Sequence, residues 1–174
     1  MRRSIILSLL IGFTILGLSC LTDCAKAYTP EQEYELSYME HTMTEYMING
    51  DWQNLLSFSD EVAKTYPRYA SAYFFKGVAL DELGRSADAI KFYNVVPKLK
   101  EDCGEYFYQA RGLAYYKLKN YKEALADYNK SMSIKPTLRA YYQRELTKYA
   151  IRQSEGISLV QKTQRAFDKD KTNK

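Results

Sequence analysis

The sequence has one histidine, His41, and three cysteines among its 174 residues. If an N-terminal signal is removed after Ala27, Cys103 is the single cysteine that remains, and no disulfide can form within the chain. His41 and Cys103 alone are also too few ligands for a structural zinc site, which takes four. The sequence therefore predicts no metal site and no cofactor.

The motifs that carry common enzyme chemistry are absent as well. The chain has no glycine-rich phosphate loop and no nucleophile elbow. Its paired carboxylates, Asp81–Glu82 and Glu101–Asp102, are adjacent in sequence, so on a helix they point in different directions and cannot share a site. We therefore predict that the protein is not an enzyme.

Strands and a nucleic-acid surface are excluded by pattern and charge. No segment alternates with period two, as a half-buried strand would. The net charge is only +4, which is too dilute for the electrostatic footprint of a nucleic-acid-binding protein. The charge is also uneven, since residues 28–63 carry eight acids and no Lys or Arg, whereas residues 139–174 carry nine bases and four acids. Such ends are solvated outer helix faces, a surface for a polar partner, or contacts between copies joined end to end.

The N-terminus has the layout of a secretory signal. Arg2 and Arg3 are followed by a run without charge up to Asp23. Small residues at positions 25 and 27 fit the cleavage rule, so residues 1–27 are expected to be a signal peptide and Tyr28 the first mature residue.

Two alternatives remain open for this segment. Gly17-Leu18-Ser19-Cys20 resembles a bacterial lipoprotein signal, in which Cys20 would be acylated. The run is also near the minimum length of a membrane span, so an uncleaved N-terminal anchor is a third interpretation. All three predict that the rest of the chain lies outside the cytoplasm, in the periplasm, in the cell envelope or secreted, and two of them attach it to a membrane.

An internal repeat covers most of the mature chain. Landmarks from residue 73 onward recur about 35 residues later and 34 residues earlier, and Pro67 recurs as Pro136. Each unit is expected to form two helices, with a turn at Gly50, at Gly84 and at Lys119-Asn120, where glycine or asparagine tolerates the left-handed conformation. The matched landmarks are Tyr73, Gly77, Ala89 and Tyr93; Tyr108, Gly112, Ala124 and Tyr128; and Met39, Met43, Leu55 and Ser59.

The segment from Tyr108 to Tyr128, running on to Pro136, resembles a tetratricopeptide repeat, and the segment from Ala70 is a second example. The resemblance implies an all-α fold, an αα-hairpin superhelix of about three repeats with a C-terminal capping helix. The repeat domain would span 28–168, with repeats at about 36–69, 70–104 and 105–138. A capping helix at 139–153 and a disordered tail at 169–174 complete the expected organisation.

The family resemblance also implies a concave groove, lined by the first helix of each repeat, that binds a protein or peptide segment. Phe74 and Val78 stand where the family's carboxylate-binding members have polar clamp residues, so the resemblance does not imply that activity. We expect a scaffold that holds a client protein, supporting assembly of an envelope complex; the alternative is a self-associating structural envelope protein. The residues expected to face the groove are Met47, Phe74, Val78, Asp81, Tyr106, Gln109, Leu113 and Tyr116, with Glu40, Thr44, Gln143 and Thr147 as further candidates.

Overall fold

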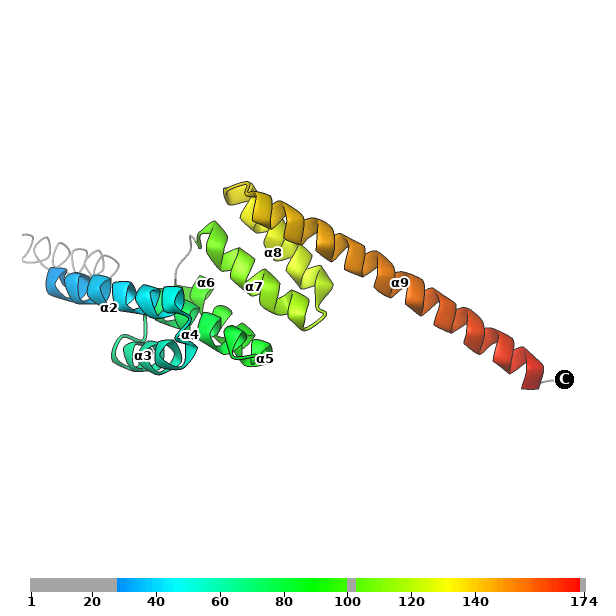
Figure 1. The fold of residues 1–174 in the computed structure, drawn as a ribbon, viewed down its shortest axis with the longest axis horizontal. Helices are drawn as coiled ribbons and strands as arrows, with labels where there is room; N and C mark the ends of the chain where they lie inside the picture. The colour runs from blue at the N-terminus through cyan, green and yellow to red at the C-terminus, as the bar shows by residue number, and fades with distance from the viewer. Residues whose placement is uncertain (1–27, 100–102, 173–174) are drawn as a thin grey trace, which may run out of the picture. The chain divides into compact units, whose positions relative to one another are not determined.

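The computed structural model describes residues 28–99 and 103–172, so the predicted signal segment and Cys20 lie outside the described residues. Every regular element in the described ranges is a helix (Figure 1), which confirms the predicted all-α class. The helices are α2 (Pro30–Asn49), α3 (Trp52–Thr65), α4 (Ala70–Glu82), α5 (Ser86–Tyr93), α6 (Val96–Leu99), α7 (Glu105–Lys117), α8 (Tyr121–Ile134) and α9 (Leu138–Thr172).

The chain divides into two compact units, residues 1–42 and 43–174, and the boundary falls within α2. The described part of the first unit is the start of α2, where the Thr29 hydroxyl accepts from the backbone N–H of Gln32 and the Gln32 side chain accepts from that of Thr29. This is a capping box, and the helix begins at Pro30.

In the second unit, helices that follow one another pack side by side. α3 contacts α4, α4 contacts α5, α5 contacts α7, α7 contacts α8, and α8 contacts α9. Figure 1 shows α7 and α8 as one such hairpin, with α9 lying along α8. The αα-hairpin arrangement predicted from the repeat is therefore present. Among the described residues, no helix combines the length and the apolar character needed to cross a membrane.

The turns within the hairpins use the left-handed conformation. Gly50 and Gly84 have φ of 70° and 78°, as expected for glycines that end a helix. In the third hairpin the left-handed residue is Lys119, with φ of 62°, and not the more tolerant Asn120. Asn120 instead precedes α8 as its N-cap residue. The repeat therefore keeps a left-handed residue at this position, although the lysine side chain disfavours that conformation.

Small residues at the repeat landmarks allow the two helices of a hairpin to approach closely. Ala89 and Ala124 are fully buried. A Cβ added to Gly77 would lie 2.6 Å from Cε1 of Tyr93, and one added to Gly112 would lie 3.0 Å from Cε1 of Tyr128. Both tyrosine rings are almost completely buried, so each packs directly on the backbone of the preceding helix.

Charged side chains link the helices across this apolar core. Arg111 donates to both carboxylate oxygens of Asp127, at 2.8 and 2.7 Å, and this pair joins α7 to α8. The same guanidinium donates to Oδ1 of Asn94 at the end of α5. Asp60 of α3 forms ion pairs with Lys64 and with Lys76 of α4, and these hydrogen bonds lower the pKa of its carboxyl group.

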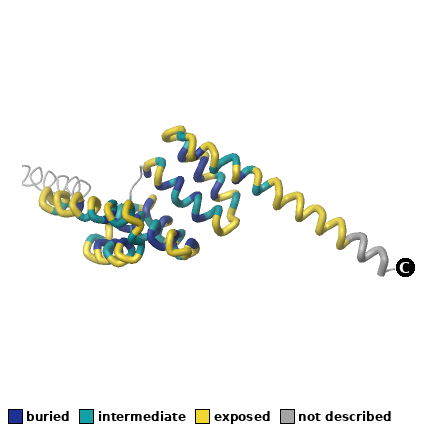
Figure 2. Tube along the Cα trace, in the orientation of Figure 1, coloured by how far each residue is buried: buried dark blue, intermediate teal, exposed yellow. Residues whose placement is uncertain are grey.

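α9 is longer than the capping helix expected at 139–153. It continues to Thr172 and so includes residues 169–172 of the predicted tail. Its first half packs on α8, with Ala140 and Thr147 fully buried. Beyond Ile151 every side chain described, up to Arg165, is exposed (Figure 2). The residues after 153 contain no proline, so the sequence has no strong helix breaker where the packing ends.

Candidate functional site

A cavity of about 420 Å³ opens within the second unit. Its lining comes from the end of α2, from the first helices α4 and α7, from α5 and from the first turn of α9. Apolar side chains predominate, and charged groups stand at its edge. The lining residues are Met47, Phe74, Val78, Asp81, Glu82, Tyr93, Tyr106, Gln109, Ala110, Leu113 and Arg139.

All but one of the eight groove residues named from the sequence line this cavity. Tyr116 is the exception: its ring packs against Tyr121, with 5.4 Å between ring centroids, at the beginning of α8. By helical period Tyr116 shares the face of Gln109 and Leu113. It lies in the last turn of α7, however, where the chain turns back into α8 and Tyr121 is its neighbour.

The four further candidates named from the sequence do not line the cavity. Thr44 is partly buried and is not part of the lining. Thr147 is fully buried, and its hydroxyl donates to the carbonyl of Gln143 at 2.7 Å. This hydrogen bond lies within α9, and neither residue lines the cavity. Glu40 belongs to the other compact unit, which is described by itself.

Two polar lining residues are committed to contacts within the protein. Asp81 is only 4% exposed, and its carboxylate accepts from the Ser86 hydroxyl at 2.5 Å and from Nζ of Lys117 at 2.9 Å. Gln109 is buried and donates through Nε2 to Oγ of Ser131 at 3.2 Å. Both side chains hold helices together, and a ligand could reach only their outer edges.

Phe74 and Val78 form the floor of the cavity. Both are partly buried and pack against two apolar clusters, one containing Leu55 and Phe75 and the other Leu80 and Phe107. The Phe74 ring lies between 5.4 and 6.4 Å, centroid to centroid, from the rings of Phe75, Tyr93 and Phe107. Its position is therefore fixed before any ligand arrives.

The accessible part of the wall is formed by Tyr106, Leu113 and Met47. Tyr106 is 68% exposed, and Leu113 and Met47 are partly exposed. Aromatic and aliphatic side chains that are accessible at the edge of a preformed apolar cavity are typical anchors for a peptide side chain.

The charges at the edge have opposite signs. Arg139 is exposed, and within the described residues it makes no ion pair. Glu82 is also exposed, and its ion pair with Lys117 is long, at 4.0 Å. Both groups therefore remain available to a charged ligand.

Tyr93, Glu82, Ala110 and Arg139 line the cavity although they were not among the expected groove residues. Tyr93 was identified only as a core landmark, yet its ring forms part of the wall. Burial, together with the nearby carboxylates of Asp81 and Glu82, raises the pKa of the Tyr93 hydroxyl far above its usual range. Arg139 has the register of Ala70 and Glu105, one repeat further on, so continuing the repeat into α9 would have identified it.

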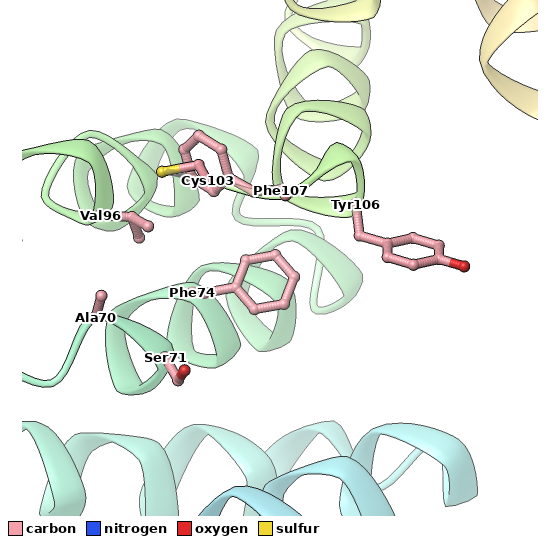
Figure 3. A pocket seen from close by; sticks show the side chains of 8 residues that line it. Ala70, Ser71, Phe74, Val96, Cys103, Tyr106 and Phe107 are labelled. Atoms are coloured by element: carbon pink, nitrogen blue, oxygen red, sulfur yellow. The ribbon is translucent and has the colours of Figure 1, made fainter. Parts of the chain in front are cut away.

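A second, smaller cavity of about 160 Å³ shares Phe74 and Tyr106 with the first. Figure 3 shows Cys103 and Phe107 on one side of it and Ala70 and Ser71 on the other. Cys103 is reduced and buried in this wall. In the part of the chain that the structure describes, no group of three or more His, Cys, Asp or Glu side chains has the geometry of a metal site.

Comparisons with known proteins agree with this geometry. Family models described as tetratricopeptide repeat match residues 57–102 and 106–138. A search of curated proteins returned no match. Among solved structures, the first tetratricopeptide domain of human RPAP3 is similar at 18% identity, with a TM-score of 0.62, over 68% of this chain and 93% of that one.

Two further solved structures are similar in fold. The Sgt2 domain from Aspergillus fumigatus has 15% identity and a TM-score of 0.62, over 73% of this chain and 83% of that one. The first tetratricopeptide domain of Spaghetti has 18% identity and a TM-score of 0.61, over 66% of this chain and 90% of that one, and it is bound to the HSP90 peptide SRMEEVD. At these identities the likeness establishes the fold. The family models and the repeat geometry together show that the chain belongs to the tetratricopeptide-repeat family.

Proposed function

We propose that this protein is a non-catalytic scaffold that holds an extended segment of a client protein in the cavity between α4 and α7. The observation that carries the proposal is the convergence of Met47, Phe74, Val78, Tyr106 and Leu113 on one apolar cavity of about 420 Å³. Such a cavity has room for one or two large apolar side chains. That the similar Spaghetti domain is bound to an HSP90 peptide supports a peptide as the ligand.

The edge of the cavity favours a particular kind of segment. Arg139 and Glu82 are both exposed at its rim. A segment with an acidic residue beside Arg139 and a basic residue beside Glu82 would therefore make a favourable charge contact at each end. An apolar anchor flanked by opposite charges is therefore the expected client motif. Because Phe74 and Val78 replace polar clamp residues, affinity would come from the buried anchor more than from a terminal carboxylate.

We also propose that the scaffold works outside the cytoplasm, in assembly of an envelope complex. This part rests on the sequence of residues 1–27, with its basic start, its uncharged apolar run and its small residues before Tyr28. Cleavage after Ala27 would release the mature chain, whereas acylation of Cys20 or an uncleaved anchor would keep it at a membrane.

Site-specific photocross-linking tests the binding proposal directly. A photoreactive phenylalanine analogue replaces Tyr106 at the edge of the cavity, and in a matched variant it replaces Lys130, an exposed residue of α8 that does not line it. In cells that make the protein naturally, irradiation should join the Tyr106 variant, and not the Lys130 variant, to a discrete client. Equal cross-linking at both positions, or none at Tyr106, would contradict a client in this cavity.

A further inference from the structure

α9 exposes the face on which the earlier repeats bury their second helix. Gly77 of α4 packs against Tyr93 of α5, and Gly112 of α7 packs against Tyr128 of α8. One repeat further on, the same position in α9 is Leu146. No helix of the described chain follows α9 to cover it, so the repeat pattern itself indicates that an α-helix would fit this face.

The uncovered face is an apolar stripe that runs along most of α9. Tyr142 and Tyr149 are 62% and 57% exposed, and Val160 is 69% exposed. Leu146 and Ile157 lie between them and are exposed as well. Ile151, Ser154 and Ser158 face the turn between α7 and α8 from the opposite side of the helix. The stripe is therefore free for its whole length.

The residue opposite Leu146 must be small. In the two earlier hairpins a tyrosine ring lies against glycine, but Leu146 occupies the space that such a ring would need. A helix that packs here must therefore offer glycine or alanine at that level. Gly156 of α9 itself is such a residue, and the space beside it is open, because a Cβ added there would have no atom within 4 Å.

We propose that α9 pairs with α9 of a second copy of the chain as an antiparallel coiled coil centred on Ile151. In this register Leu146 of each copy faces Gly156 of the other, since both lie equally far from the centre. Tyr142 then faces Val160, and Tyr149 faces Gln153. The residues at these levels follow the alternating spacing of four and three that a coiled-coil seam requires.

The stripe is large enough for a stable dimer and is complementary to itself. The exposed parts of its five apolar side chains amount to roughly 600 Å² per copy, so complete burial would remove about 1,200 Å² for the pair, which is the lower end of the range of specific interfaces. The contact is closed by two-fold symmetry, because each copy supplies both the leucine and the glycine. It does not involve the client cavity and so stands apart from the proposed function.

Thiol cross-linking of the purified full chain tests the pairing and its register. A short bis-maleimide is added to two variants, Arg152→Cys and Arg165→Cys, in a mild detergent that keeps the apolar N-terminus dispersed. Residue 152 lies next to the centre, within reach of its own copy, whereas the two copies of residue 165 would be about 40 Å apart along the helices. The parent chain, with its own three cysteines, sets the background.

Arg152→Cys should give a cross-linked dimer, and Arg165→Cys should remain at background. Adding Val160→Glu should reduce the dimer at least tenfold, whereas adding Gln161→Glu, an equal charge on an exposed residue outside the stripe, should leave it unchanged. Circular dichroism of both variants should match the parent, because neither position is packed. No dimer for Arg152→Cys, equal cross-linking at both cysteine positions, or a dimer unaffected by Val160→Glu would overturn the proposal.

Discussion

Replacing Gly77 with alanine should destabilise the domain, although alanine is the better helix former. In a helix interior that exchange normally gains about 1 kcal/mol. Here the new Cβ would lie 2.6 and 2.7 Å from two carbons of the Tyr93 ring. The ring is 1% exposed and enclosed on all sides, so it cannot move away without disturbing the core. Overpacking of this kind costs about 1–3 kcal/mol, so after the gain in helix propensity we expect a net loss of up to about 2 kcal/mol.

Two other glycines provide matched comparisons. At Gly112 a new Cβ would lie 3.0 Å from the nearest carbon of the Tyr128 ring, so Gly112→Ala should be close to neutral. Gly112→Leu should cost roughly 3 kcal/mol, because a whole side chain must enter the contact. Gly156 has open space around it, so Gly156→Ala should be neutral or stabilising. Urea denaturation followed by helical circular dichroism gives the midpoints. A Gly77→Ala midpoint as high as that of Gly156→Ala would refute the close contact between α4 and α5.

Three further predictions concern the charged links, the buried tyrosine and the N-terminus. Arg111→Ala should lower the free energy of unfolding by about 3 kcal/mol in chemical denaturation, because it leaves the buried carboxylate of Asp127 without its partner. Arg111→Lys should recover little of that stability, since lysine cannot bind both carboxylate oxygens. Full recovery of stability in Arg111→Lys would contradict the bidentate role. Because the pKa of the Tyr93 hydroxyl is raised in the folded protein, this hydroxyl loses its proton at a lower pH in the unfolded chain, so stability should fall as the pH rises above about 10. Tyr93→Phe should therefore raise the pH midpoint of alkaline unfolding. An unchanged midpoint would contradict the buried, neutral hydroxyl. Mass spectrometry of the chain from a bacterial host should find a free Tyr28, an acylated Cys20 or an uncleaved chain in the envelope, whereas uncleaved chain in the cytosol would contradict export.

The sequence was sufficient for the helices and for most of the cavity. The glycines at 77 and 112 and the tyrosines that face them recur at a fixed spacing, because each repeat must solve the same packing problem. Once that register was known, residues four apart on α4 and α7, such as Phe74 with Val78, could be placed on one face. The same register placed a turn at Lys119-Asn120, but asparagine was the residue expected to tolerate the left-handed conformation, and Lys119 adopts it.

What the sequence did not predict depends on three-dimensional neighbours. Tyr116 has the right period, but its ring is drawn to Tyr121 across the turn into α8. Arg139 reaches the cavity because α9 packs on α8, and the repeat signatures are absent from that helix. The length of α9 was also missed, because the described side chains from 152 to 165 are exposed and so no burial pattern marks this part of the helix.

The most direct test of the groove is a titration of the client peptide, identified by cross-linking, against three alanine variants. Tyr106→Ala and Leu113→Ala remove accessible walls of the cavity, and each should weaken binding by roughly 5- to 150-fold, equivalent to about 1–3 kcal/mol. Tyr116→Ala serves as the control, because its ring packs outside the cavity, and its affinity should equal that of the parent. A similar loss for Tyr116→Ala, or an unchanged affinity for both Tyr106→Ala and Leu113→Ala, would show that the client binds elsewhere.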